Sequence, residues 1–159
     1  MPYPVPQTVA GVYINLVTGV FSITPAGAPG WEFNPFGTVA NGLTFFFLTG
    51  APNTSAGASS AGAYTVLASG ASIGPANTYI SATTVTAAAN WRAGSFGQYF
   101  GLRFYNESTL TTNYGWIQLD TAGTTGHPAV IRGYCYENTG APILAGSTTP
   151  VELQGFSVE

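Results

Sequence analysis

Apolar and polar residues alternate most regularly in the last third of the chain. The pattern predicts three strands there, at residues 98–105, 113–119 and 129–137, and turn-forming residues separate them. Each segment is rich in aromatic residues and punctuated by glycine, and each is as long as a typical strand. Three such strands joined by short turns are typical of an antiparallel sheet.

Alternate positions give each of these strands two unlike faces, because successive side chains of a strand point to opposite sides. Phe100, Leu102 and Phe104 share one face of the first strand and are predicted to be core residues. The amphipathic side chains of the three strands form a candidate interaction face. Its members are Tyr99, Arg103, Tyr105, Tyr114, Trp116, Tyr134 and Tyr136. Three roles are open for this face: a second packing layer, a partner surface or a ligand platform.

The rest of the chain repeats the pattern of short strands and turns. Residues 11–17 and 20–24 flank Thr18-Gly19 and predict a hairpin. Residues 43–49 predict a buried central strand, whereas the Ser-, Ala- and Gly-rich residues 51–62 predict a mobile surface loop. Further short strands are predicted at 63–68, 78–81 and 83–86, and one helical turn at 87–91.

The fold class follows from these segments. Convincing helical periodicity is absent, and turn signals recur about every 8–12 residues, as in sandwiches and barrels. We therefore predict an all-β antiparallel β-sandwich, jelly-roll-like, with little helix. Residues 1–10 are rich in proline and predict an extended arm, and residues 11–159 predict a single domain large enough to bury a core.

Charged side chains are scarce. They make up 6% of the 159 residues, there is no lysine, and the formal net charge is -3. Three scattered arginines cannot form the basic patch that nucleic acid requires. No apolar run approaches the roughly 20 residues that span a bilayer, so we predict no membrane insertion. The lack of lysine and the abundance of Thr, Ala, Gly and Asn predict a secreted bacterial protein, extracellular or at the cell surface.

Nucleophilic catalysis finds little support in the sequence. His127 is the single histidine, and it lies in a turn where we predict a solvated side chain. Cys135 is the single cysteine, and its apolar strand predicts a buried, inert thiol. No Gly-x-Ser-x-Gly motif is present. We therefore predict that the protein is not an enzyme.

Carboxylates are the other candidates for chemistry, because a pair of them can hydrolyse glycosides. The candidates are Glu32, Glu107, Asp120 and Glu137. We favour a structural ion pair in which Glu137 meets Arg103 or Arg132 across strands, with Asp120 solvated at a strand end. No residue cluster has metal-ligand spacing, so we predict no cofactor. A calcium site built from Asp120 and loop carbonyls is the one metal hypothesis that stays open.

Four motifs together resemble a family of secreted bacterial β-domains. They are Gly-x-Arg-Phe at 101–104, Tyr-Gly-Trp-x-x-Leu at 114–119, Gly-Tyr-x-Tyr-Glu at 133–137 and Pro-Ile-x-Ala-Gly at 142–146. Many members of that family carry carboxyl-terminal sorting signals, and residues 150–158 are similar to the tails that follow such domains. The resemblance implies an extracellular β-domain and no particular activity.

Two functions are compatible with these observations. Low charge permits self-association, and lysines that would guard strand edges are missing. We expect a structural protein that assembles as a homo-oligomer or polymer into a filament, surface layer or matrix, with Pro2–Val17 reaching a neighbouring copy by strand exchange. The alternative is an extracellular carbohydrate-binding or adhesive module, with a polysaccharide partner on exposed aromatics such as Trp31, Trp91 and Trp116.

Overall fold

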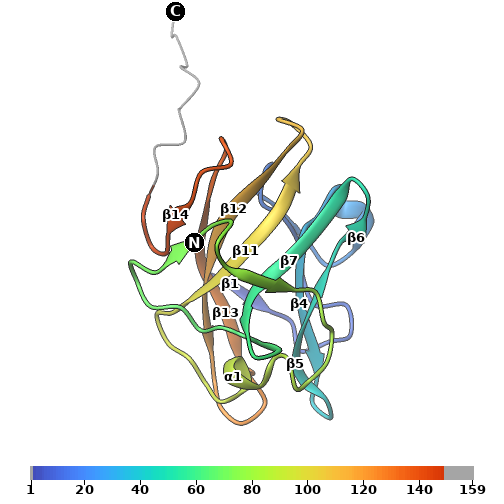
Figure 1. The fold of residues 1–159 in the computed structure, drawn as a ribbon. Helices are drawn as coiled ribbons and strands as arrows, with labels where there is room; N and C mark the ends of the chain where they lie inside the picture. Colours follow the sequence, from blue (N-terminus) through green and yellow to red (C-terminus); the bar gives the residue numbers. More distant parts are fainter. Residues whose placement is uncertain (1, 149–159) are drawn as a thin grey trace, which may run out of the picture.

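Two antiparallel sheets pack face to face in the computed structural model, which describes residues 2–148 (Figure 1). The larger sheet is eight-stranded, with the order β1-β13-β12-β11-β7-β10 and with β6 and β8 also paired to β7. The smaller sheet is four-stranded, in the order β3-β2-β4-β5. The predicted all-β sandwich with little helix is confirmed. The tail at 150–158 lies outside the described residues.

The strands of the first half are mostly short, and the longest strands come late in the chain. The first half contains β1 (Tyr3–Val5), β2 (Tyr13–Asn15), β3 (Val20–Ser22), β4 (Phe33–Thr38), β5 (Gly42–Phe47), β6 (Thr49–Gly50), β7 (Asn53–Ser60), β8 (Ala63–Tyr64), β9 (Ser72–Ile73) and β10 (Thr78–Ile80). The second half contains α1 (Ala89–Arg92), β11 (Tyr99–Asn106), β12 (Thr111–Thr121), β13 (Ala129–Glu137) and β14 (Ile143–Leu144). A 3₁₀ turn, η1, covers Pro25–Gly27.

The three aromatic strands form the meander that their spacing predicts, β11 to β12 to β13. The predicted hairpin is β2–β3, the predicted buried strand is β5, and the predicted helical turn is α1. Residues 83–86, predicted as a strand, belong to none.

The prediction for residues 51–62 is wrong. Most of this segment is β7, an inner strand that pairs with β11 on one side and β10 on the other. Its small residues are required by the core, because a Cβ atom at Gly57 would lie 2.6 Å from Cζ of Phe100 and 2.8 Å from Cδ1 of Tyr64. The composition that resembles a flexible loop therefore makes room for aromatic rings.

Aromatic rings supply most of the layer between the sheets. The ring of Phe100, on β11, lies 4.8 Å from Phe33 and 4.7 Å from Phe45, measured between centroids. Tyr64 lies 5.4 Å away and Trp91 5.6 Å away. These side chains are fully buried, so the rings of both sheets and of α1 meet at Phe100.

A β-bulge interrupts the pairing of β12 with β13. Gln118 lies opposite Gly133, but Leu119 lies opposite Ile131, so Arg132 has no cross-strand partner of its own. One extra residue reverses the alternation of faces on the strand that carries it. After the bulge, odd and even positions of β13 exchange sides of the sheet.

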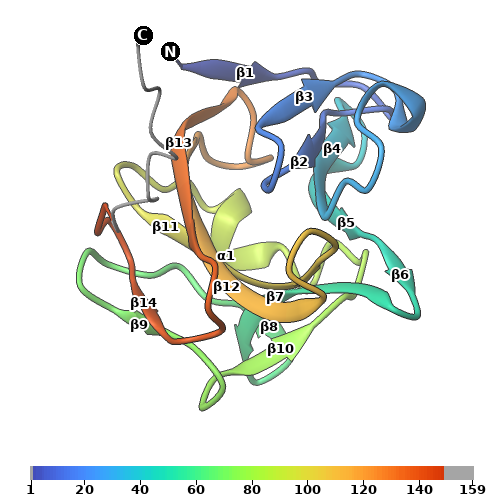
Figure 2. The ribbon, with the colours of Figure 1, turned by 90° about the horizontal axis from the view of Figure 1, so that it is seen from above.

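A small third layer covers part of the outer face of the larger sheet. Strands β9 and β14 pair with each other beside β12 (Figure 2). Ile73 and Ile143 from this layer pack with Tyr114 and Trp116 from β12. The indole N–H of Trp116 also donates to the carbonyl of Ser147 at 3.1 Å.

The close packing over Gly57 predicts a large effect of a small substitution. We expect Gly57→Ala to lower the free energy of unfolding by about 1–3 kcal/mol, because the added methyl group overlaps the Phe100 ring. Chemical denaturation measures the change. Gly50→Ala is the matched control, since nothing lies within 4 Å of its added Cβ atom, and it should stay within about 0.5 kcal/mol of the parent. Equal effects of the two substitutions would contradict the packing described here.

Candidate functional site

Strands β1, β3 and β13 come together along one side of the sandwich (Figure 2). Residues of these strands and of the β2–β3 turn line a groove there. It consists of two cavities of about 340 and 270 Å³, and Tyr134 lines both. Strand β1 pairs only with residues 129–131 of β13. On the edge of β13 that faces β1, the residues after Ile131 border this groove. They pair there with no further strand among residues 2–148.

Three aromatic rings line the groove, each in contact with the next. Tyr3 of β1 lies 5.1 Å from Phe21 of β3, and Phe21 lies 5.8 Å from Tyr134 of β13. The Tyr134 hydroxyl approaches the Thr18-Gly19 turn, where a Cβ atom at Gly19 would lie 2.6 Å from it. Gly19 also has φ +70°, so both its backbone and its surroundings favour glycine. Burial raises the pKa of Tyr134, which keeps its hydroxyl neutral.

Strand β1 is blocked on its outer edge by proline. Proline has no N–H, so a sheet accommodates Pro4 only with its nitrogen directed away from β13. Pro4 therefore protects this edge, although the chain has no lysine to do so. Within the predicted arm, residues Tyr3–Val5 are extended and lie in the sheet of their own chain, whereas residues 7–10 form bends.

Glu32 lies buried behind the groove. It is 4% exposed, and its Oε2 accepts the backbone N–H of Leu16, a groove residue, at 2.8 Å. Burial raises the pKa of Glu32 to about 8, with a smaller contribution from the charge of Glu107. A void beside Glu32 is too small to admit water, so a sugar has no access to this carboxyl. The arrangement offers no support for glycoside hydrolysis by Glu32 and Glu107.

The candidate interaction face is divided by the β-bulge. Tyr134 and Tyr136 pack against the main core from the inner side of the sheet, so their assignment to that face is wrong. Tyr114 and Trp116 do lie on the outer face, but they are only 8% and 7% exposed beneath β9 and β14. For these two residues the second-packing-layer hypothesis is the correct one.

The remaining members of the candidate face differ in exposure. Tyr99 is half-buried against Trp116, with ring centroids 5.1 Å apart, and Tyr105 is also half-buried. Arg103 is exposed, and its guanidinium carbon lies 4.9 Å from the centroid of the Tyr79 ring. This cation–π contact links β11 to β10 across the outer surface.

The predicted ion pair has different partners from those expected. Arg132 Nε donates to Asp120 Oδ2 at 2.6 Å, so its partner is Asp120, which is 6% exposed and not a solvated strand end. Glu137 instead accepts the backbone N–H groups of Thr139 and Ala141 at 2.9 and 2.8 Å and holds the turn after β13. The bulge turns Arg132 toward β12, which position counting could not anticipate.

His127 and Cys135 also differ from their predicted settings. His127 is 7% exposed, and neither ring nitrogen has a hydrogen-bond partner in residues 2–148. Burial lowers its pKa, so the neutral imidazole is favoured. Cys135 is only partly buried, because the bulge places it on the outer face opposite Trp116.

Exposed platforms for sugar rings are fewer than the sequence suggests. Trp31, Trp91 and Trp116 are all buried. The exposed aromatic side chains of the described residues are Phe46 and Phe96. The groove adds the half-buried rings of Tyr3, Phe21 and Tyr134 to these two exposed side chains.

Residues 2–148 contain no cluster of three or more His, Cys, Asp or Glu side chains that could hold a metal ion. Asp120, the residue of the calcium hypothesis, uses Oδ2 for Arg132 and Oδ1 for the backbone N–H of Gly97 at 2.8 Å. Both carboxylate oxygens are therefore engaged within the fold.

Comparisons with protein-family models, with curated proteins and with solved structures find no match. The resemblance to secreted bacterial β-domains therefore stays a prediction. Within residues 2–148, no helix is long and apolar enough to cross a membrane.

Glu32 predicts a loss of stability as pH rises. The unfolded chain ionises this carboxyl above about pH 4.5, whereas the folded chain keeps it neutral up to about pH 8. Stability should therefore fall across that window, by at most about 1.4 kcal/mol per pH unit. Gln is neutral at every pH and keeps an oxygen for Leu16, so Glu32→Gln should raise the unfolding free energy at pH 8 and change it little near pH 4.5. An equal effect at both pH values would contradict the burial of a neutral carboxyl.

His127 predicts the opposite dependence. Below about pH 6.5 the unfolded chain takes up a proton that the buried imidazole resists, so the folded state loses stability as pH falls. Because neither nitrogen has a partner, we expect His127→Leu to be tolerated near neutral pH. Urea denaturation should show that the unfolding free energy of the variant, relative to that of the parent, is higher at about pH 5 than at neutral pH. A constant difference between the two proteins would rule this out.

Proposed function

We propose that this chain is a secreted structural protein that self-associates, with β1 exchanged between neighbouring copies. Exchange replaces contacts within one chain by the same contacts between chains, so no new surface has to evolve. The pairing of β1 with residues 129–131 of β13 carries the proposal, because it identifies both the segment that would be exchanged and the strand that would receive it. We place the assembly outside the cell because the chain lacks lysine and is rich in Thr, Ala, Gly and Asn.

Strand β1 is held by few contacts. Its three residues pair with residues 129–131, and Val5 is its one buried side chain. Tyr3 adds the ring contact with Phe21 across the groove. Release of so short a strand costs little compared with unfolding of the sandwich, which favours exchange.

Pro4 of β1 favours exchange over simple edge addition. A neighbour that added a strand to the outer edge of β1 would find no N–H at Pro4. If β1 moved to the β13 strand of a neighbouring copy, it would pair there through Tyr3 and Val5, as it does within its own chain. Residues 7–9 are exposed and form the connection that would have to straighten.

Carbohydrate binding is the second candidate, and the aromatic groove is the observation that favours it. Tyr3, Phe21 and Tyr134 offer ring faces beside the polar Arg132 side chain. A polysaccharide bound there should quench or shift Tyr fluorescence and lose affinity in Phe21→Ala. Unchanged fluorescence with a glycan panel would remove this candidate.

A disulfide trap tests exchange. Val5 and Ala129 lie directly opposite each other, so Val5→Cys and Ala129→Cys should form a disulfide when β1 is seated. Cys135→Ser removes the competing thiol. If β1 is exchanged in the assembly, oxidation of the assembled protein should give a ladder of covalent oligomers on a non-reducing gel.

The control is the same triple variant oxidised in dilute solution before assembly, which should run as a monomer and fail to assemble. A monomer band alone from the assembled sample would show that β1 stays with its own chain, and the exchange mechanism would be wrong.

A further inference from the structure

Charges are distributed unevenly along the strand direction of the sandwich. Arg132 is neutralised by Asp120 near the middle, and Glu32 is buried and neutral. Arg92 lies on α1 at one end of the molecule, and Glu107 lies at the other end, where β11 turns into β12 (Figure 1). The eight residues of β11 correspond to roughly 26 Å between these ends.

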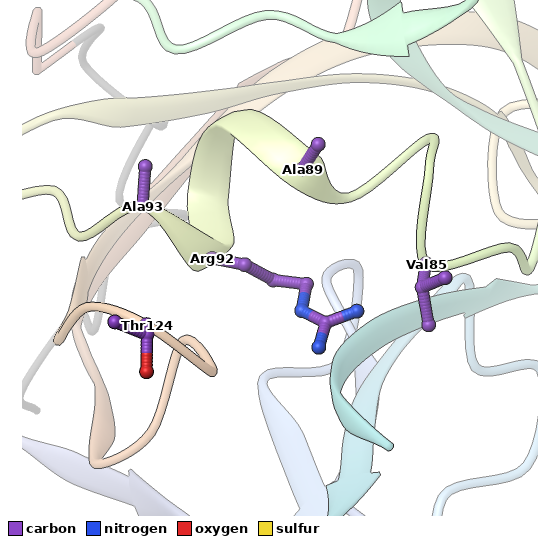
Figure 3. Close-up of a pocket in the computed structure, with 5 residues that line it drawn as sticks. All are labelled: Val85, Ala89, Arg92, Ala93 and Thr124. Atoms are coloured by element: carbon purple, nitrogen blue, oxygen red, sulfur yellow. The ribbon is translucent and has the colours of Figure 1, made fainter.

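The α1 end contains a pocket around an arginine without a partner. The pocket has a volume of about 390 Å³, and the Arg92 guanidinium extends into it between Val85, Ala89 and Thr124 (Figure 3). No hydrogen bond or ion pair engages the Arg92 side chain within residues 2–148. The pocket therefore combines largely apolar walls with one uncompensated positive charge.

One exposed apolar side chain lines this pocket, and two more lie within a few residues of α1 or of Gly42 along the chain. Val85, in its wall, is 45% exposed, and Phe96, shortly after α1, is 73% exposed. Val39 is 79% exposed in the β4–β5 turn, close to Gly42, where an added Cβ atom would lie 2.6 Å from an Arg92 nitrogen. An arginine surrounded by apolar side chains is typical of a protein interface.

The opposite end is exposed and acidic. The β11–β12 turn, residues 107–110, is exposed throughout, and Leu110 at its end is 71% exposed with φ +58°. Glu107 Oε1 accepts a hydrogen bond from Asn53 at 2.7 Å, which fixes the carboxylate without neutralising its charge. Glu137 lies at the same end of the neighbouring strand β13.

We infer that the turn 107–110 of one copy docks into the Arg92 pocket of the next, with Glu107 facing Arg92 and Leu110 against Val85. This contact rests on the proposed self-association and adds to it a second, head-to-tail interface. Its two surfaces are different patches of the same chain, so it does not close on itself as a twofold dimer does. Unless the rotation between copies closes a ring, repetition of such a contact produces a filament.

Charge reversal tests this contact. Arg92→Glu places two acids face to face, and Glu107→Arg places two arginines face to face, so each variant should associate at least about tenfold more weakly than the parent. An equal mixture of the two variants restores opposite charges at every contact and should recover association. Sedimentation velocity over a concentration series measures all four samples. The parent should also associate more weakly at high salt, because the pair lies at the rim of an interface.

Arg103→Glu is the matched control, since it makes the same change in charge on the outer face of β11 and should associate like the parent. Unchanged far-UV circular dichroism and unfolding midpoints establish that the variants fold. Parent-like association of Arg92→Glu, or a mixture no better than its components, would overturn the contact. If a disulfide ladder were seen all the same, self-association would stand and only this interface would be wrong. A parent that stays monomeric would remove both proposals.

Discussion

The contact of the Phe100 ring with the backbone of Gly57 is the constraint on which the sandwich depends. It sets how closely β7 approaches the aromatic layer, because any Cβ atom at residue 57 would overlap the ring. The same ring meets Phe33 and Phe45 from the opposite sheet, so one position fixes the spacing of the two sheets. A chain with few aliphatic side chains builds its core from large rings, and the smallest residues must face them.

The long strands were predictable because their alternation extends over many residues, as in β11 and β13. Strand β7 was not, since its glycine and alanine residues carry no hydrophobic signal and acquire their role only from rings distant in sequence. The faces of Tyr134 and Tyr136 were mispredicted because the bulge at Arg132 depends on cross-strand register, which one strand's sequence does not contain. The burial of His127 likewise arises from packing of its turn, since turn composition alone predicts a solvated side chain.

These corrections move the candidate site from the outer face to the seam between the sheets. The outer Tyr and Trp side chains are closed over by β9 and β14, so they stabilise the fold. The surfaces left open are the groove beneath β1 and the two unlike ends of the sandwich. These surfaces suit a partner that is another copy, because β1 pairs with β13 at one end of the groove and the acidic turn complements Arg92. A molecule with so little charge has weak repulsion to oppose either contact.

Self-association of the unmodified protein is the central claim, and its mass in solution tests it most directly. Light scattering coupled to size exclusion, with negative-stain electron microscopy of the same fractions, should show particles many times heavier than 16.4 kDa and extended filaments or sheets. A single monodisperse species of 16.4 kDa at every concentration, with no ordered particles on the grid, would contradict the account.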